Sequence, residues 1–182
     1  MIRYLSLFCV AALPAFAQNL PAPRPMDQMH GDCGAFAMDV SREEALWASG
    51  SLDAGTAGAE SGSGPMLAPG VLAHVALQPQ SAVTFAVAPG QDRGAADHYA
   101  GHLRLTIPEA GLWRVAASNG LWFDAVSGGA IVDSSTFEMQ TGCAGPFKVV
   151  VFDLPAGEVD FQFNGSPSPM VEVVALPWAM PE

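Results

Sequence analysis

The strongest fold signal in the chain is Leu112-Trp-Arg-Val-Ala-Ala-Ser-Asn-Gly-Leu-Trp-Phe-Asp-Ala-Val126, in which two runs of strand-forming residues flank the pair Asn119-Gly120. An Asn-Gly pair readily takes the positive φ angles of a type I′ turn, which is a common two-residue connection in β-hairpins. The stretch therefore predicts a central antiparallel hairpin. A two-residue turn would place Val115 opposite Asp124.

This register predicts a polar side chain on an apolar face. Asp124 would share that face with Trp113 and Trp122, and a carboxylate in such surroundings must find a hydrogen-bond donor or lie at the rim. We expect Asp124 to be structurally paired, with Arg104 as the candidate donor. The alternative is that Asp124, Trp113 and Trp122 form the polar and aromatic anchors of a ligand pocket.

Further strand-sized segments follow residue 70, separated by turn signals such as Pro-Gly, Pro-Ala-Gly and Asn-Gly. Eight short strands at this spacing are typical of an antiparallel β-sandwich or jelly roll, and the fold is expected to be all-β with one short N-terminal helix. Within 159–163 apolar and polar residues alternate, which predicts one face exposed to water. The expected strands are 71–77, 82–87, 102–107, 112–118, 121–126, 147–154, 159–163 and 170–176.

The N-terminal residues predict export. Residues 1–17 combine Arg3, an apolar run and Ala15-Phe-Ala17, the pattern of a cleaved secretory signal peptide, so the mature chain is expected to begin at Gln18. No later segment reaches about 18 apolar residues, so no membrane insertion is expected. We therefore predict a periplasmic or secreted protein.

Two segments separate the signal from the predicted sandwich. Residues 18–48 are expected to form an arm with a short helix that ends near Ala48, because Ser41 and Glu44 have the spacing of a capping box. Residues 49–70, rich in Gly, Ala and Ser, predict a mobile loop. The sandwich then spans 71–178, and arm and sandwich are expected to form one globular domain.

Charge and cysteine content restrict the partners and the compartment. The formal net charge of −11, with Lys148 as the single lysine, argues against nucleic acid or an anionic membrane surface as a partner. Cys33 and Cys143 are the two cysteines left after removal of the signal, and in an oxidising compartment such a pair predicts a disulfide. Closing a loop of this length would stabilise the fold by about 4–5 kcal/mol and attach the arm to the β domain.

The turn-then-strand segments Ile107-Pro-Glu-Ala-Gly-Leu-Trp and Phe152-Asp-Leu-Pro-Ala-Gly-Glu-Val resemble those of secreted accessory β-sandwich modules of the pre-peptidase C-terminal and carbohydrate-binding types. Cys33-x-x-Phe36, Ser-Arg-Glu-Glu-Ala-Leu-Trp47 and Gly142-Cys143 are similar to a group of small, uncharacterised secreted proteobacterial proteins. This resemblance implies an exported single domain with Cys33 and Cys143 paired, and it implies no activity. Some such proteins carry a homogentisate dioxygenase label, but this chain lacks a recognisable facial triad.

The sharpest candidate for metal chemistry is the segment with Met26, Met29 and His30. Thioether and imidazole ligands suit Cu(I), so a periplasmic copper-binding protein is one hypothesis. Two methionines and one histidine in a proline-rich arm also arise easily by chance, and the default expectation is no cofactor. His98 and His102 are four residues apart, which on a strand separates them by about 13 Å and argues against joint ligation.

No catalytic residues can be assigned, because the chain lacks a nucleophile elbow and a phosphate-binding glycine loop. We therefore expect a non-enzymatic binding protein whose partner is a small-molecule or glycan ligand, another protein or an envelope component. Copper binding is the alternative function, and the dioxygenase label is the weaker one.

Overall fold

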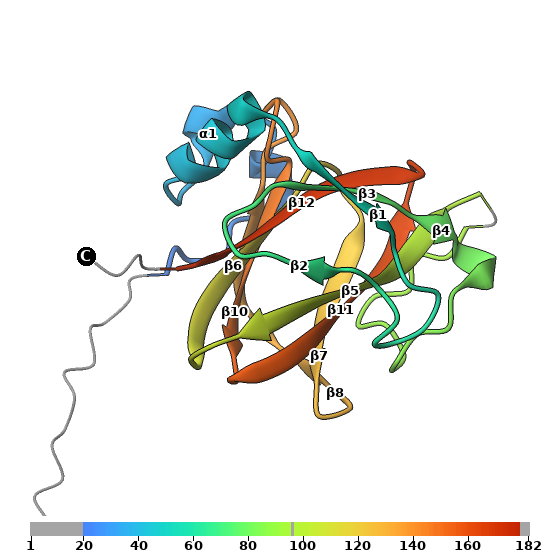
Figure 1. Cartoon of the computed structure of the whole chain (residues 1–182). Coiled ribbons are helices and arrows are strands. Elements are labelled where there is room, and N and C mark those ends of the chain that lie inside the picture. Colours follow the sequence, from blue (N-terminus) through green and yellow to red (C-terminus); the bar gives the residue numbers. More distant parts are fainter. Residues whose placement is uncertain (1–19, 96, 179–182) are drawn as a thin grey trace, which may run out of the picture.

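The computed structural model describes residues 20–95 and 97–178, and the predicted signal peptide at 1–17 with its cleavage at Gln18 lies outside these residues. The described chain forms a β-sandwich of two mixed sheets with one α-helix, which confirms the all-β prediction (Figure 1). Sheet 1 has the strand order β1 (Leu52–Thr56), β3 (Ala73–Ala76), β12 (Met170–Pro177), β6 (Gly111–Ala117), β10 (Lys148–Leu154) and β9 (Ser134–Met139). Sheet 2 has the order β2 (Met66–Leu67), β5 (Tyr99–Ile107), β11 (Gly157–Ser166), β7 (Trp122–Ser127) and β8 (Ala130–Val132), and β4 (Gln78–Pro79) pairs with β5.

The helical segments are α1 (Ser41–Ser49) and the short 3₁₀ turns η1 (Met26–Gln28), η2 (Cys33–Ala35) and η3 (Gln80–Ala82). The helix lies where the sequence predicts it. The predicted capping box is not formed, because Ser41 is already the first helical residue and its side chain does not cap the helix. Asp39 takes over this role by accepting a 2.9 Å hydrogen bond from the Ser41 backbone N–H.

Two sequence-based assignments between residues 49 and 87 are wrong. The predicted loop at 49–70 contains β1 and β2, which pair in parallel with β3 and β5, so the sandwich is not purely antiparallel. A segment rich in Gly, Ala and Ser carries no strand signal in its own sequence. Pairing with β3 and β5 holds parts of this segment in an extended conformation. The predicted strand 82–87 is instead part of a loop, because its backbone bonds to side chains of sheet 2 rather than to a neighbouring strand.

The predicted central hairpin is also wrong. β6 pairs with β10 and β12 in sheet 1, whereas β7 pairs with β11 and β8 in sheet 2. Neither Asn119 nor Gly120 has a positive φ angle. The Asn119 side chain instead accepts a 3.0 Å hydrogen bond from the Leu121 backbone N–H, as in an Asx turn, and the chain crosses from one sheet to the other.

The crossover explains why the hairpin is not formed. With β6 and β7 in different sheets, Val115 and Phe123 both enter the core between the sheets. Asp124 then lies on the outer face of sheet 2. A hairpin in the predicted register would instead have placed this carboxylate beside Val115 on the apolar face, where an unpaired charge is costly.

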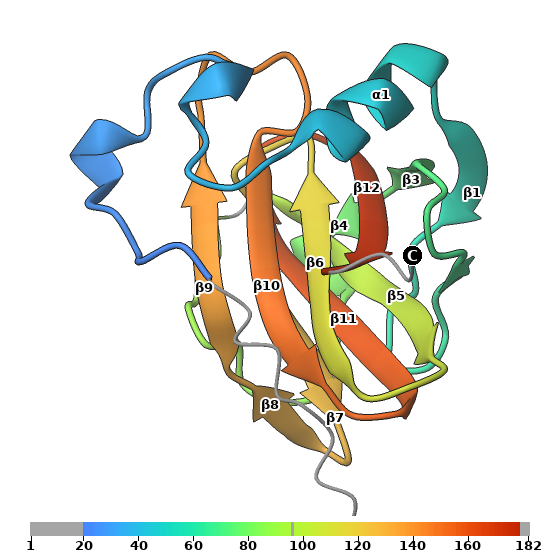
Figure 2. The same ribbon diagram turned by 90° about the vertical axis from the view of Figure 1, so that its left-hand side faces the viewer.

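The N-terminal arm and α1 lie over one end of the outer face of sheet 1 (Figure 2). Phe36, Leu46 and Trp47 pack there against Val149 and Val151 of β10, as expected for a central strand that is apolar on both faces. The predicted disulfide between Cys33 and Cys143 is present and joins the arm to the segment before β10. A buried ion pair between Glu43 of α1 and Arg114 of β6 adds a polar attachment.

The segment 80–95 lies over the outer face of sheet 2, so most of the β11 face that the sequence predicted to be exposed to water is buried. Of the residues predicted to face water, Glu158 is exposed, but Asp160 and Gln162 are buried, and so is Asn164 on the same face. Polar side chains there bond to the loop instead of water. The loop thereby reaches the edge of sheet 2 where the candidate site lies.

Candidate ligand-binding pocket at the edge of the sandwich

A pocket opens where the two sheets fail to meet along one side of the sandwich. β8 pairs only with residues 125–127 of β7, so residues 122–124 form an open edge of sheet 2. β9 is the edge strand of sheet 1 on the same side. Between these edges lies a cavity of about 220 Å³. Its lining residues are Gly90, Trp122, Phe123, Asp124, Ile131, Val132, Asp133, Ser134, Phe137, Lys148, Val150 and Phe152.

A β-bulge shapes the β9 wall of this pocket. Val151 of β10 pairs with Thr136, but Phe152 pairs with Ser134, so Ser135 is the extra residue on β9. A bulge changes the side to which the following side chains point. Here it brings Ser134 onto the same side as Phe152, and both line the pocket, whereas Ser135 does not.

Lys148 stands at the first position of β10, where its side chain enters the pocket. Its Nζ donates a 3.3 Å hydrogen bond to the backbone carbonyl of Leu121. It also lies 5.0 Å from the ring centroids of both Trp122 and Phe123, a distance at which a cation interacts with an aromatic face. The single lysine of this acidic chain is therefore buried among aromatic rings.

Burial changes the protonation of Lys148. Desolvation, followed by the positive charge of Arg93, lowers the pKa of the amine from 10.5 to about 8, although the Asp124 carboxylate acts in the opposite direction. Arg93 lies 6.0 Å from the Trp122 ring centroid and donates a hydrogen bond to the carbonyl of Gly120. A substantial fraction of the Lys148 amine is therefore neutral near pH 8.

Asp124 is structurally paired, as the sequence predicts, but its partners differ from the expected one. Trp122 Nε1 donates to Oδ1 at 2.7 Å, and both the Gly90 backbone N–H and Gln162 Nε2 donate to Oδ2 at 3.1 Å. Arg104 is not among these donors. It bonds to the carbonyl of Gly64 and forms an ion pair with Glu158 at 3.6 Å.

Of the three residues predicted to form a ligand site, the structure brings two together in the pocket. Trp122 and Asp124 line it, whereas Trp113 is only 5% exposed and belongs to the core between the sheets. Sequence reasoning missed Lys148. The available signal was the single lysine of the chain, which is the second residue of the otherwise apolar start of the predicted strand 147–154.

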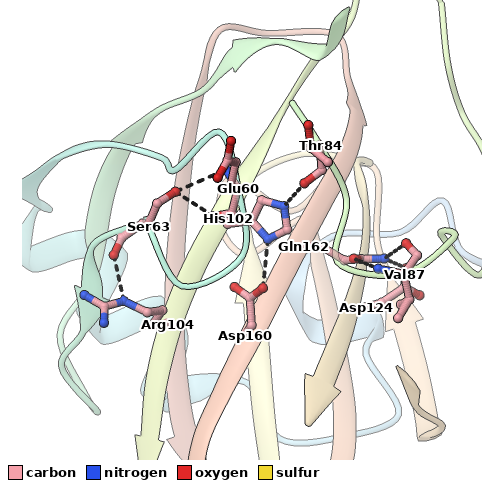
Figure 3. A network of polar contacts seen from close by, with 10 residues as sticks. Glu60, Ser63, Thr84, Val87, His102, Arg104, Asp124, Asp160 and Gln162 are labelled. Atoms are coloured by element: carbon pink, nitrogen blue, oxygen red, sulfur yellow. Dashed lines mark hydrogen bonds and ion pairs between the residues drawn. The ribbon is translucent and has the colours of Figure 1, made fainter. Parts of the chain in front are cut away.

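A row of polar contacts holds the segment 80–95 beside the pocket (Figure 3). His102 lies between Asp160 and the carbonyl of Thr84, at 2.9 and 3.0 Å, and Gln162 bonds to both backbone groups of Val87. Asn164 accepts from the Arg93 backbone N–H at 3.1 Å. Side chains of sheet 2 thus satisfy backbone groups that a neighbouring strand would otherwise bind.

Both histidines that the sequence singled out for their spacing, His98 and His102, take part in hydrogen bonds. Both ring nitrogens of buried His102 are occupied by the contacts with Asp160 and Thr84. His98 Nδ1 contacts the carbonyl of Arg93 at 2.9 Å. Within residues 20–95 and 97–178, no group of three His, Cys, Asp or Glu side chains is arranged to hold a metal ion.

The residues of the copper hypothesis occupy different environments. Met26 is 54% exposed and Met29 is completely buried. His30 is exposed, and its Nδ1 lies 3.4 Å from the Thr141 hydroxyl. The described structure does not present the three side chains on one exposed surface, and copper binding stays a prediction.

None of the helices in the described part of the chain has the length and apolar character needed to span a membrane. In comparisons with known proteins, no family model matches this chain, and no curated protein or solved structure is significantly similar to it.

Proposed function

We propose that this chain is an exported, non-enzymatic binding protein that holds a small ligand in the pocket between β7 and β9. The observation that carries the proposal is the pocket itself, which combines aromatic and aliphatic walls with a single amine. Ligand sites of proteins are mostly apolar concavities with a few well-placed polar groups. Seven of the twelve lining residues are apolar, and Asp124, Asp133, Ser134 and Lys148 supply the polar groups.

The volume of the pocket limits the size of the ligand. A cavity of about 150 Å³ accommodates benzene, and this pocket measures about 220 Å³. It therefore fits one six-membered ring with a small substituent. The rings of Trp122, Phe137 and Phe152 would contact the apolar body, and Lys148 would meet the polar substituent.

Export to the periplasm or secretion is part of the proposal. It is supported by the signal-like pattern of residues 1–17 and by the disulfide between Cys33 and Cys143, since stable disulfides are characteristic of oxidising compartments. The buried position of most aromatic residues favours a small ligand over a glycan chain, because glycans require an exposed aromatic platform. Trp113 is buried, and Trp47, Trp122 and Trp178 are half-buried.

Calorimetric titration of the chain starting at Gln18 tests this function, with benzyl alcohol, benzoate and benzaldehyde as probes of the same size. Ser134→Trp places a large side chain on the pocket wall, and Ser135→Trp is the matched control on the neighbouring exposed residue that does not line it. We expect at least one probe to bind, with binding lost in Ser134→Trp and retained in Ser135→Trp. Absence of binding by every probe, or equal loss in both variants, would overturn the proposal.

A further inference from the structure

We infer that Lys148 captures carbonyl compounds: its amine forms a reversible imine with the aldehyde group of a small aromatic or aliphatic ligand held in the pocket. This inference rests on the proposed function and names the ligand class of the same site. It assigns Lys148 a covalent role that goes beyond contact with a polar substituent.

The first argument is the lack of a counter-ion for Lys148. In the part of the chain that the structure describes, no carboxylate lies within ion-pair distance of Nζ, and the Leu121 carbonyl is its hydrogen-bond acceptor. Two carboxylates line the same pocket, Asp124 and Asp133, and neither forms an ion pair with Nζ; the two oxygens of Asp124 already accept three hydrogen bonds. A structural buried lysine is usually paired with a carboxylate, so this arrangement needs another explanation.

The second argument is the position of the amine relative to the cavity. A single hydrogen bond leaves room at Nζ for a bond to a ligand atom, and the rings of Trp122 and Phe123 lie 5.0 Å away on the pocket wall. An aldehyde carbon held by these rings would face the amine directly. The surrounding apolar side chains would also restrict water, which slows hydrolysis of an imine.

The third argument separates an aldehyde from a carboxylate ligand. Desolvation and the charge of Arg93 lower the pKa of Lys148 to about 8, which favours the neutral amine that attacks carbonyl groups. A site for a carboxylate ligand would instead keep the amine protonated and offer further hydrogen-bond donors to the carboxylate oxygens. The nearest other cation, Arg93, already donates to the carbonyl of Gly120 and to the side chain of Gln91.

The chemical step needs no oxidant or reductant. The nitrogen lone pair attacks the carbonyl carbon, a C–N bond forms, and the π electrons of the C=O bond move to oxygen. A proton passes from nitrogen to that oxygen to give a carbinolamine. Loss of water then forms the C=N bond, and addition of water reverses the sequence and releases the aldehyde.

The single lysine makes the test unusually direct, because the chain starting at Gln18 offers only two primary amines, Lys148 and the α-amino group. We would incubate this protein with benzaldehyde and cyanoborohydride, which reduces the imine to a stable secondary amine, and locate the adduct by peptide mass mapping. The expected result is modification at Lys148 at least tenfold faster than that of the lysine model compound Nα-acetyl-lysine amide. Because the pKa of Lys148 is lowered to about 8, its rate advantage over the model compound is expected to be larger at pH 7 than at pH 10.

Two variants provide the controls. Lys148→Arg retains the charge without the nucleophile, and Lys148→Met retains the length without either, so at least one is expected to fold and to lose the adduct. Ser134→Trp is expected to abolish labelling of Lys148, and Ser135→Trp to preserve it. Labelling confined to the α-amino group, or a Lys148 rate no faster than the model compound, would overturn the inference. Binding of benzyl alcohol without imine formation would leave the proposed function intact, whereas failure of every probe to bind would refute both.

Discussion

Replacing Lys148 by methionine tests the energetic account of the pocket independently of any ligand. The pKa of the amine falls from 10.5 to about 8 on folding. At about 1.4 kcal/mol for each tenfold change in the proton-binding constant, burial of the charged form costs about 3 kcal/mol relative to the neutral form. Methionine fills a similar volume without a charge. The Lys148→Met variant loses the hydrogen bond to the Leu121 carbonyl and the cation's contact with two aromatic faces.

The pH dependence gives the sharpest form of this prediction. Because the folded-state pKa of Lys148 lies below the unfolded value, its contribution to stability is present in full above pH 10.5 and is lost as the pH falls through 8. The wild-type chain should therefore gain stability relative to Lys148→Met as the pH rises. Between pH 7 and pH 10 we expect this difference to change by about 2–3 kcal/mol.

Urea unfolding of both proteins at pH 7, 8.5 and 10, followed by tryptophan fluorescence, measures the difference directly. Other titrating groups occur in both chains and cancel in the comparison. At pH 7 we expect Lys148→Met to be the more stable protein, with an advantage that decreases as the pH rises. A difference in unfolding free energy that stays constant from pH 7 to 10 would show that Lys148 is not desolvated as described and would refute the reasoning.

The remaining predictions concern the groups that hold the loop, the arm and the helix in place. Asp124→Ala should lower the unfolding free energy by about 2–4 kcal/mol, because three donors lose their acceptor; urea unfolding measures this, and an equal effect of Asp153→Ala at an exposed site of β10 would contradict it. Glu43→Gln should cost about 3–5 kcal/mol since Arg114 stays buried without a counter-ion, whereas the exposed neighbour Glu44→Gln should change stability by less than about 0.5 kcal/mol; thermal and urea denaturation would reveal any failure of this contrast. Removing the disulfide with Cys33→Ser and Cys143→Ser should lower stability by about 4–5 kcal/mol, and a loss below about 1 kcal/mol in urea would indicate that the arm docks without it.

The sequence alone was sufficient for features that depend on local pattern or simple pairing. Periodic alternation and turn residues identified the all-β class and most long strands, among them the run 147–154, which forms β10. The helix that begins at Ser41 was expected from the spacing of Ser41 and Glu44, although the capping box itself does not form, and the disulfide of Cys33 with Cys143 followed from cysteine number. Export, the resemblance to secreted proteins and copper binding stay predictions.

Tertiary structure decided how these elements pair and which side chains meet. The Asn119-Gly120 pair is compatible with a hairpin and with a crossover, and the crossover forms because it places both Val115 and Phe123 in the core while Asp124 meets its donors outside. The β-propensity of a residue does not depend on which side chains each of the two alternative pairings would bury. The segment that the sequence predicted as a hairpin therefore forms the connection between the two sheets.

The pocket could not be predicted for the same physical reason. Asp124 and Trp122 were singled out, but the partner that gives the site its chemistry, Lys148, is distant in sequence and meets them only because β7 and β10 belong to opposite sheets. The early end of β8 and the bulge at Ser135 open the space between them. Residue types determined what chemistry was available, and only the packing of the two sheets decided that a desolvated amine would lie beside aromatic rings in a cavity.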